Sequence, residues 1–349
     1  MRATMAYGTR NGESLTAVRI ERRDLRPTDV AIEITYCGVC HSDLHALREH
    51  GRSGPADLLV PGHEFVGTVS AIGAAVRTFA IGDPVAVGNI VDSCGTCDMC
   101  RRGQENFCEE FPTTTYGGQD RRDGTTTLGG YSRDTVVDER FVYHRPEHLE
   151  AASVAPLMCA GITVWEPLRQ WNIGRGSSVG VAGLGGLGHL AVKLARALGA
   201  TVTVFTTSPR KAEDARALGA AEVIVSTDTE ALSAVRNHFD LVIDTISAPH
   251  AVEPYLSTVA LDGALCLVGH LGETNVDVLS LLIGRKSLTS AGSGGHFHTQ
   301  ELLDFCGEHG ITADVEVLPS REVNVALGRL ARNDVRYRFV LDMADLDRA

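Results

Sequence analysis

The sequence predicts an α/β protein of two domains, one rich in β-strands and one built on a doubly wound parallel sheet. A chain of 349 residues is longer than a single hydrophobic core normally supports, so two domains are expected. Up to about residue 150, short alternating apolar segments are separated by glycine and proline, as in β-rich domains. Beyond that point, short apolar segments alternate with helical segments of about 10–15 residues, as in parallel sheets.

The β-rich domain is predicted over residues 1–155 and is completed by the C-terminal segment 294–349. Its strands alternate apolar and polar residues or follow turns that contain glycine and proline. The clearest stretches are Val18–Ile20, Val30–Tyr36, Val60–Ile72 and Gly82–Val87. The C-terminal segment mixes helix and strand and ends with Arg336–Asp342, so we expect it to fold back onto the first domain.

The parallel-sheet domain is predicted over residues 156–293. Its expected strands are Ser177–Ala182, Thr201–Phe205, Glu222–Ser226, Phe239–Asp244 and Ala264–Val268. The expected helices are Ala151–Gln170, Leu187–Leu198 and Pro209–Leu218. Because strands and helices alternate along the chain, each strand should run parallel to its neighbours, with helices covering the sheet.

Composition and charge exclude several kinds of partner. The net charge of −12 opposes nucleic acid, which requires clustered Lys and Arg; the basic pairs Arg22–Arg23, Arg101–Arg102 and Arg121–Arg122 are short and separated. The N-terminus has no apolar signal region, and no window approaches the roughly 18–20 apolar residues of a membrane span. We therefore expect a cytoplasmic protein with no membrane partner, whose nine cysteines indicate metal binding or catalysis before disulfides.

A glycine-rich motif marks a candidate nucleotide site. The motif consists of Gly183, Leu184, Gly185, Gly186, Leu187 and Gly188. A G-x-G-x-x-G pattern alone is weak evidence, but here it follows a predicted strand and opens a predicted helix, as dinucleotide binding requires. The glycines allow a tight turn close to a pyrophosphate, and the helix N-terminus supplies N–H groups. The alternative is a glycine-rich turn without a ligand.

The end of the next strand distinguishes NADP from NAD. NAD-binding proteins place Asp or Glu about 20 residues beyond the glycine motif, where the carboxylate binds the ribose hydroxyls. Here the segment Phe205–Lys211 contains no carboxylate. Its hydroxyls and cations suit the 2′-phosphate of NADP, and the candidates are Thr206, Thr207, Ser208, Arg210 and Lys211. Alternatively, Arg210 and Lys211 only begin a surface helix.

Four cysteines in one loop form the first candidate metal site. They are Cys94, Cys97, Cys100 and Cys108. This spacing is typical of a closed, tetrahedral structural zinc site with four thiolates. A four-cysteine iron–sulfur centre is the competing interpretation, but the nucleotide loop already supplies a two-electron carrier. We predict a zinc ion that holds the loop and performs no chemistry.

A second cluster of reactive side chains lies in the stretch Cys37–His45. Its C-x-x-C pair is ambiguous, since it could be redox-active, hold half of a metal site or consist of two buried thiols. His63, in a turn, and Cys159, in an apolar segment between the domains, could join Cys40 as metal ligands. Such a set leaves a fourth position open, as a catalytic zinc requires. Spacing alone does not decide between this set, a core thiol and a turn-capping histidine.

Taken in order, these motifs resemble the zinc-dependent medium-chain dehydrogenase/reductase superfamily, most closely its cinnamyl-alcohol-dehydrogenase branch. The resembling stretches are Cys37–His45, Pro61–Glu64, the cysteine loop 94–108, Gly129–Ser132, Pro156–Thr163, Gly183–Gly188 and Arg336–Val340. The segment Thr206–Lys211 resembles, without copying, the serine-rich phosphate loop of that branch. The resemblance implies a GroES-like β-rich domain and a Rossmann cofactor domain, with the active site in the cleft between them.

The resemblance also implies a catalytic zinc ion. Its ligands would be Cys40, His63 and Cys159, and Glu64 matches a position whose carboxylate becomes a ligand when water leaves. Asp43 matches a carboxylate that orients the His63 imidazole, a role with a plain physical basis. Together with the cysteine loop, this predicts two zinc ions per chain.

Further positions matched by the resemblance concern the proton and the cofactor. Ser42 and His45 match a proton relay between the substrate oxygen and solvent. His41 matches a contact to the cofactor pyrophosphate, and Thr163 is expected at the cofactor site. No role in the pattern falls to His250, His270, His296 and His298, which we assign to the surface or to packing. Candidates for the substrate pocket are Trp165, Leu44 and Tyr116.

The predicted function is a cytoplasmic, NADP-dependent zinc alcohol dehydrogenase that works as a broad-specificity aldehyde reductase on small-molecule aldehydes and alcohols. The resemblance implies a homodimer or homotetramer. One alternative is an NAD-dependent zinc polyol or formaldehyde-type dehydrogenase, against which the missing carboxylate argues. The other is a non-catalytic zinc- or nucleotide-binding protein on the same scaffold, against which the complete ligand set and relay argue.

Overall fold

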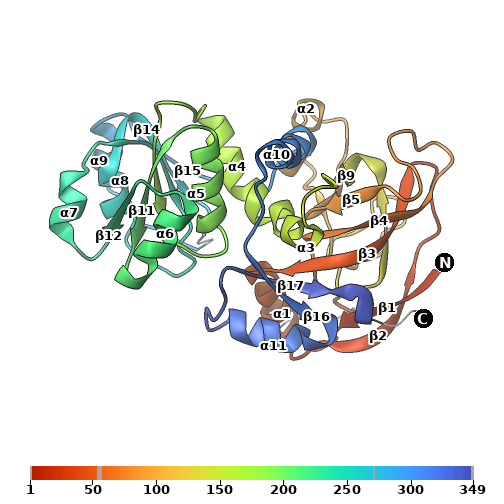
Figure 1. Ribbon diagram of the computed structural model, residues 1–349. Helices are drawn as coiled ribbons and strands as arrows, with labels where there is room; N and C mark the ends of the chain where they lie inside the picture. The colour runs from red at the N-terminus through yellow and green to blue at the C-terminus, as the bar shows by residue number, and fades with distance from the viewer. Residues whose placement is uncertain (1, 53–56, 270–271, 347–349) are drawn as a thin grey trace. The chain divides into compact units, whose positions relative to one another are not determined.

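The computed structural model describes residues 2–52, 57–269 and 272–346, and the chain forms two compact units (Figure 1). The first unit comprises Met1–Cys159 and Gly294–Ala349, and the second comprises Ala160–Ser293. The division follows Cys159, four residues beyond the predicted boundary. Cys159 therefore belongs to the same unit as Cys40 and His63.

The first unit is built on a seven-stranded sheet in the order β16-β17-β3-β4-β5-β9, with β8 also paired to β3. Its strands are β3 (Asp29–Val39), β4 (Phe65–Ile72), β5 (Pro84–Val87), β8 (Asp134–Asp138), β9 (Tyr143–His144), β16 (Val315–Pro319) and β17 (Arg338–Asp342). Smaller ladders join β1 (Arg2–Gly8) to β2 (Thr16–Arg22) and β6 (Ile90–Asp92) to β7 (Thr113–Thr114). The C-terminal segment joins this unit because β17 pairs antiparallel with β3.

Strand β3 is the centre of this unit. It pairs antiparallel with β4, β8 and β17, and its residues Ile32 and Ile34 are fully buried among Phe65 and Phe339. The helices of the unit are α1 (His41–Arg52), α2 (Asp98–Arg101), α3 (Ala151–Val154), α10 (His296–His309) and α11 (Val323–Leu330). Helix α1 begins two residues after β3 ends, so the buried strand fixes the start of the Cys37–His45 stretch.

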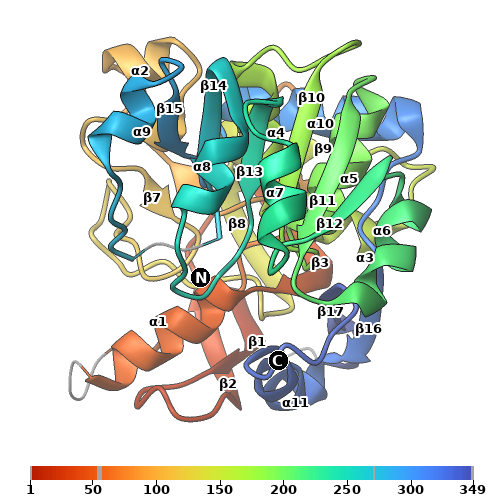
Figure 2. The ribbon, with the colours of Figure 1, turned by 90° about the vertical axis from the view of Figure 1, so that its left-hand side faces the viewer.

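The second unit is a six-stranded parallel sheet in the order β12-β11-β10-β13-β14-β15, which confirms the predicted doubly wound fold. The strands are β10 (Ser178–Ala182), β11 (Thr201–Thr206), β12 (Glu222–Val225), β13 (Phe239–Asp244), β14 (Val259–Leu267) and β15 (Ser287–Ser290). The helices are α4 (Ala160–Gln170), α5 (Gly188–Ala197), α6 (Ala212–Leu218), α7 (Thr229–Ala234), α8 (Glu253–Thr258) and α9 (Val278–Leu282). Figure 2 shows this sheet with α7 and α8 on one face.

The strand order reverses between β10 and β13, which are neighbours in the sheet. In open parallel sheets, ligands bind beyond the carboxyl ends of the strands at such a switch point. The glycine motif follows β10 directly, and the loop after β13 borders it. This arrangement sets the place of the nucleotide site within the second unit.

The predicted continuous helix Ala151–Gln170 is wrong. The chain forms α3, then a short 3₁₀ helix Ala155–Met158, and resumes as α4 at Ala160. Pro156 lies in the first turn of the 3₁₀ helix, where its missing N–H is tolerated, and Cys159 leaves helical geometry with φ −130° and ψ −72°. The break places the partly buried Cys159 thiol at the end of a helix instead of inside one.

Within the described residues, no single helix is long and apolar enough to cross a membrane. Only the bent pair Ala151–Met158 and Ala160–Gln170 reaches that length and hydropathy, and the two pieces do so together.

Candidate active site and metal centres

Three donor atoms from distant parts of the first unit meet at one point. Cys40 lies between β3 and α1, His63 lies in the turn before β4, and Cys159 ends the 3₁₀ helix. Their ligand atoms all lie within 4.8 Å of one another. The two sulfurs are 3.8 Å apart, and His63 Nε2 is 3.2 Å from the Cys159 sulfur. Tetrahedral zinc with bonds to sulfur of about 2.3 Å requires sulfurs about 3.8 Å apart, so this set fits zinc.

The buried Asp43 carboxylate organises this set. Asp43 is fully buried in the first turn of α1 and accepts a hydrogen bond from His63 Nδ1 at 3.2 Å. This bond orients the ring so that Nε2 faces the sulfurs. Three more donors satisfy the carboxylate: the N–H of Cys40 (2.9 Å), the N–H of Gly62 (3.1 Å) and the hydroxyl of Tyr131 (2.9 Å).

The electrostatics of the set favour one thiolate and a charged imidazole when no metal is bound. The hydrogen bond from Cys159 holds the pKa of Cys40 well below its usual value, and the same bond raises that of Cys159. Burial lowers the pKa of His63, but the charge and hydrogen bond of Asp43 outweigh it, so the pKa is raised well above its usual value. Metal binding must therefore release protons from this site.

Glu64 lies beside the set but points to a different partner. Its carboxylate forms a buried ion pair with Arg338 of β17, and the three-residue donor group does not include it. Burial raises the pKa of Glu64 to about 7 despite the charge of Arg338. A Cβ on Gly38 would overlap this carboxyl group, so only glycine leaves it room. Exchange of Glu64 into the ligand set stays a prediction.

Helix α1 carries the residues expected to handle the proton. Ser42 and His45 are exposed and three residues apart, so they lie on one face, while Asp43 and Leu47 are buried on the other. The Ser42 hydroxyl lies 3.7 Å from the Cys40 sulfur, next to the donor set. His41, at the start of the helix, is half-buried, and burial lowers its pKa.

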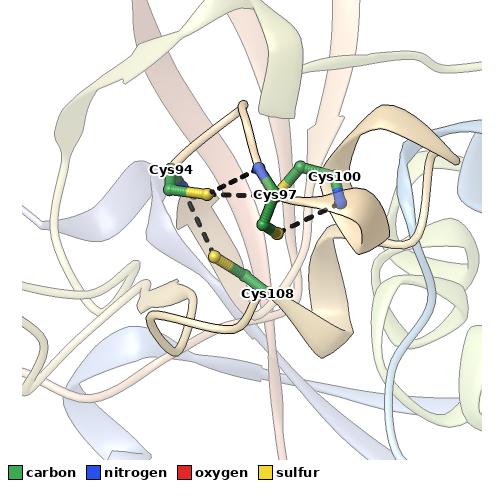
Figure 3. Close-up of side chains that lie close together, drawn as sticks. All are labelled: Cys94, Cys97, Cys100 and Cys108. Carbon is green, nitrogen blue, oxygen red and sulfur yellow. Dashed lines mark hydrogen bonds between the residues drawn. The ribbon is translucent and has the colours of Figure 1, made fainter.

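The four cysteines of the loop also converge (Figure 3). The sulfurs of Cys94 and Cys100 are 3.8 Å apart, as tetrahedral zinc requires. Backbone N–H groups stabilise the thiolates: those of Thr96 and Cys97 donate to the Cys94 sulfur and lower its pKa to about 6. Burial instead raises the pKa of Cys100 to about 12. The donor chemistry fits a metal held by four sulfurs.

The glycine loop of the second unit has the geometry that its sequence predicts. Gly183 has φ +89°, which other residues rarely adopt. A Cβ on Gly188 would overlap the Gly183 carbonyl, so the helix packs closely against the strand. A Cβ on Gly185 would meet nothing within 4 Å, which leaves space beside the backbone for a ligand. Thr163, on α4 of the same unit, is buried.

The five candidates for the 2′-phosphate lie at the end of β11 and just after it. Thr206 is buried, and its hydroxyl accepts the N–H of Ser208 at 3.2 Å, so it shapes the turn. Thr207, Arg210 and Lys211 are exposed. Lys211 Nζ donates to the carbonyl of Leu184 at 2.9 Å, which brings the end of this turn to the glycine loop.

Several residues that sequence reasoning left without a role belong to these sites. Tyr131 and Arg338 both stand in motifs that carry the resemblance, which was the available signal. Of the pocket candidates, the Tyr116 ring lies 5.7 Å from the His63 ring, Leu44 is half-buried on α1, and Trp165 is buried in the second unit.

The unassigned histidines have different surroundings. The His250 ring lies 2.7 Å from the carboxylate of the buried Asp244, and His296 packs against Tyr143 with ring centroids 5.5 Å apart. His298 is half-buried on α10. His270 lies outside the described residues.

Comparison with known proteins defines the class. Residues 26–147 match the alcohol dehydrogenase GroES-like domain, and residues 186–308 match the zinc-binding dehydrogenase domain. The chain is 45% identical over 345 residues to aldehyde reductase YahK of Escherichia coli, covering 98% of each protein. It is 44% identical over 350 residues to NADP-dependent alcohol dehydrogenase C 1 of Mycolicibacterium smegmatis, covering 99% of each.

Solved structures agree with this result. Cinnamyl alcohol dehydrogenase SbCAD4 of Sorghum bicolor superposes with a TM-score of 0.93 at 40% identity, covering 100% of this chain and 99% of that one. The enzyme CAD from Helicobacter pylori, complexed with NADP(H), gives a TM-score of 0.90 at 32% identity, covering 99% and 100%. The chain belongs to the zinc-dependent medium-chain dehydrogenase/reductase family, in its cinnamyl-alcohol-dehydrogenase branch, as the sequence predicted.

Proposed function

We propose that this protein is a zinc-dependent alcohol dehydrogenase that uses NADP(H) and acts as a broad-specificity aldehyde reductase. The observation that carries the proposal is the donor set Cys40, His63 and Cys159, because three donors leave one tetrahedral position open, as catalytic zinc sites do. The names of its relatives, an aldehyde reductase and an NADP-dependent alcohol dehydrogenase, support the reaction class.

Each part of the proposed reaction has its own residues. Cys40, His63 and Cys159 would hold a zinc ion, which would supply Lewis-acid chemistry toward a substrate carbonyl. The glycine loop Gly183–Gly188 would hold NADPH, which would supply the hydride. Asp43 keeps the His63 ring in the orientation that donates Nε2. The four cysteines of the loop would hold a second zinc ion; a four-donor set would leave no position for substrate, so this ion would stabilise the fold.

We propose that Ser42 and His45 carry the proton. The Ser42 hydroxyl lies beside the donor set, and the His45 ring lies on the same exposed face of α1. A hydroxyl can both donate and accept, so Ser42 can pass a proton to a substrate oxygen while it receives another from an exposed imidazole. The contact of His41 with the cofactor pyrophosphate stays a prediction.

The choice of NADP over NAD rests on the turn after β11. The turn offers Thr207, Ser208, Arg210 and Lys211 as hydroxyl and cation donors, with no carboxylate to repel a phosphate. An NAD-dependent polyol or formaldehyde-type dehydrogenase is the alternative, and this composition argues against it.

We further propose a cytoplasmic homodimer or homotetramer. All nine cysteines are free thiols, as in a reducing compartment. Among the described residues, strand β15 pairs only with β14, at the edge of the second sheet. Near it in sequence, α9 and the residue after it expose large apolar side chains: Val278, Leu279, Leu282 and Ile283. An open edge beside exposed apolar residues suits a second copy of the chain.

Initial rates with NADPH and NADH test the function. A panel of aromatic and aliphatic aldehydes should be reduced with a kcat/KM for NADPH about 10- to 100-fold above that for NADH, the value of one or two charge-assisted hydrogen bonds. Equal rates with both cofactors would refute the NADP assignment. No turnover of any aldehyde by the zinc-loaded protein would refute the enzyme assignment.

A further inference from the structure

Three side chains contact the four successive carbonyl groups from Ala182, at the end of β10, to Gly185 in the glycine loop, and the Thr245 hydroxyl is shared between the first two. The Thr245 hydroxyl lies 2.8 Å from the carbonyl oxygen of Ala182 and 3.2 Å from that of Gly183. Lys211 Nζ donates to the Leu184 carbonyl at 2.9 Å, and the ring of His189, at Nδ1, lies 3.0 Å from the Gly185 carbonyl. The loop is therefore fixed by contacts that its own G-x-G-x-x-G pattern does not contain.

These contacts bear on phosphate binding through the planarity of the peptide bond. The carbonyl of one residue and the N–H of the next point to opposite sides of a trans peptide. Fixing the carbonyls of Gly183 to Gly185 therefore fixes the direction of the N–H groups of Leu184 to Gly186. N–H groups at the start of a helix are the ones that bind phosphate.

Thr245 lies closest to the turn itself. A Cβ placed on Gly183 would come within 2.9 Å of the Thr245 hydroxyl, and one placed on Gly188 within 3.2 Å. The N–H of Thr245 also donates to the Ala182 carbonyl at 2.9 Å. Thr245, the first residue after β13, thus supports both ends of the glycine loop.

A contact between a histidine ring and a buried carboxylate anchors the segment that carries Thr245. His250 Nε2 lies 2.7 Å from the buried Asp244 carboxylate, and His250 Nδ1 lies 2.9 Å from the Ala248 carbonyl oxygen. The His250 ring thus bridges the Asp244 carboxylate and the Ala248 carbonyl, and it closes the segment Thr245–His250 into a short loop. The second carboxylate oxygen of Asp244 accepts the N–H of Ile246 at 3.0 Å.

We propose that Thr245 is a positioning residue for the cofactor pyrophosphate, and that His250, through Asp244, holds Thr245 in place. The proposal rests on the assignment of the glycine loop as the NADP(H) site. Thr245 acts through the loop carbonyls, and its contribution is to NADP(H) affinity.

The test compares NADPH affinity in Thr245→Val and His250→Phe with that of the wild-type holoenzyme, by fluorescence titration. Loss of one or two hydrogen bonds should raise the Kd about tenfold in Thr245→Val and about fivefold in His250→Phe. The KM for NADPH should rise more than kcat falls. Thr245→Ser keeps the hydroxyl and should bind NADPH within about twofold of wild type, which separates the hydroxyl from general damage to the unit.

Two matched controls lie in the same unit. Thr258 is fully buried, and its hydroxyl donates to the Tyr255 carbonyl at 2.7 Å, so Thr258→Val removes an equivalent bond in α8. His238 packs its exposed ring against Phe239 at the other end of β13, so His238→Phe is the control for His250. Both controls should leave the NADPH Kd within about twofold of wild type.

A second ligand distinguishes positioning from loosening of the whole unit. Adenosine 2′-monophosphate carries the 2′-phosphate but no pyrophosphate, so Thr245→Val should not weaken its binding. If Thr245→Val weakened the binding of adenosine 2′-monophosphate and of NADPH equally, the proposal would be overturned. An unchanged NADPH Kd in Thr245→Val would overturn it as well. Failure of the wild-type protein to bind NADPH would instead refute the nucleotide site itself, and this proposal with it.

Discussion

The two cysteine-containing sites of the first unit use the same ligand atoms in opposite ways. In the loop site, Cys94 and Cys108 are 14 residues apart, and nearby backbone N–H groups stabilise the sulfurs at 3.3–3.5 Å. In the other site, Cys40 and Cys159 are 119 residues apart, and a buried carboxylate holds the third donor, His63. Four local donors complete a tetrahedral set, whereas three donors from distant parts of the unit leave one tetrahedral position open.

The largest expected effect comes from removing one donor of the three. Cys40→Ser should lower kcat/KM by about a thousandfold or more, since the Lewis acid contributes several kcal/mol to the transition state. Metal analysis and initial rates measure this. Cys37→Ala is the matched control because Cys37 is fully buried three residues away and is not in the donor set. Full activity in Cys40→Ser would contradict the assignment.

Removing one donor of the four should affect stability first. Cys100→Ser should release the loop metal and lower the free energy of unfolding by several kcal/mol, because metal binding to such a site is part of folding. Thermal melting and zinc content measure this, and the three-donor site should remain loaded in the folded fraction. An unchanged melting temperature with one zinc lost would show that the loop site does not stabilise the fold.

The carboxylate behind His63 should have a weaker effect. Asp43→Asn should lower zinc affinity at the three-donor site about 10- to 100-fold, because the amide orients and charges the ring less well. Competition with a chelator measures the affinity. Asp98→Asn is the comparison, since Asp98 is an exposed carboxylate in the cysteine loop that pairs only with Arg101 in the structure described. Equal zinc loss in both variants would argue against a specific role of Asp43.

The smallest expected effect on stability concerns the ion pair between Arg26 and Asp120, a residue that follows the cysteine loop in sequence. Arg26 binds both oxygens of Asp120, at 2.7 and 3.0 Å. Burial raises the pKa of Asp120, but the hydrogen bonds and charge of Arg26, together with the N–H groups of Arg122 and Asp123, outweigh burial, so the pKa is lowered. Because the pKa is lower in the folded protein, the Asp120 carboxylate stabilises the fold at pH values above the unfolded pKa of 3.8. This stabilisation is lost as pH falls through the pKa of the folded protein. Asp120→Asn should cost about 1 kcal/mol at pH 7 and less near pH 3.5, by urea unfolding. An equal cost at both pH values would show that charge is not involved.

The same contrast explains how much the sequence could predict. The loop site was predictable because its four ligands are close in sequence and need no knowledge of the fold. The doubly wound sheet was predictable because strands and helices alternate in local patterns. The three-donor site could only be inferred through the family resemblance, since nothing local connects residue 40 with residue 159.

The contacts behind the three-donor site could not be predicted. Tyr131 bonds to Asp43 across 88 residues, and Arg338 bonds to Glu64 across 274. Such pairs depend on strand register, which places β17 beside β3. The break at Cys159 was missed because Ala- and Leu-rich composition predicts a continuous helix, whereas tertiary packing ended it at that residue.

Zinc content per chain, measured on the wild-type protein and on Cys40→Ser, tests the central claim most directly. The two donor groups predict two zinc ions in the wild type and one in the variant. Aldehyde reduction should be lost with the zinc ion of the three-donor site, and the fold should be kept because the loop zinc ion remains. A wild-type protein that reduces aldehydes with only the loop zinc bound, or a Cys40→Ser variant that keeps both ions and full activity, would contradict this division of roles.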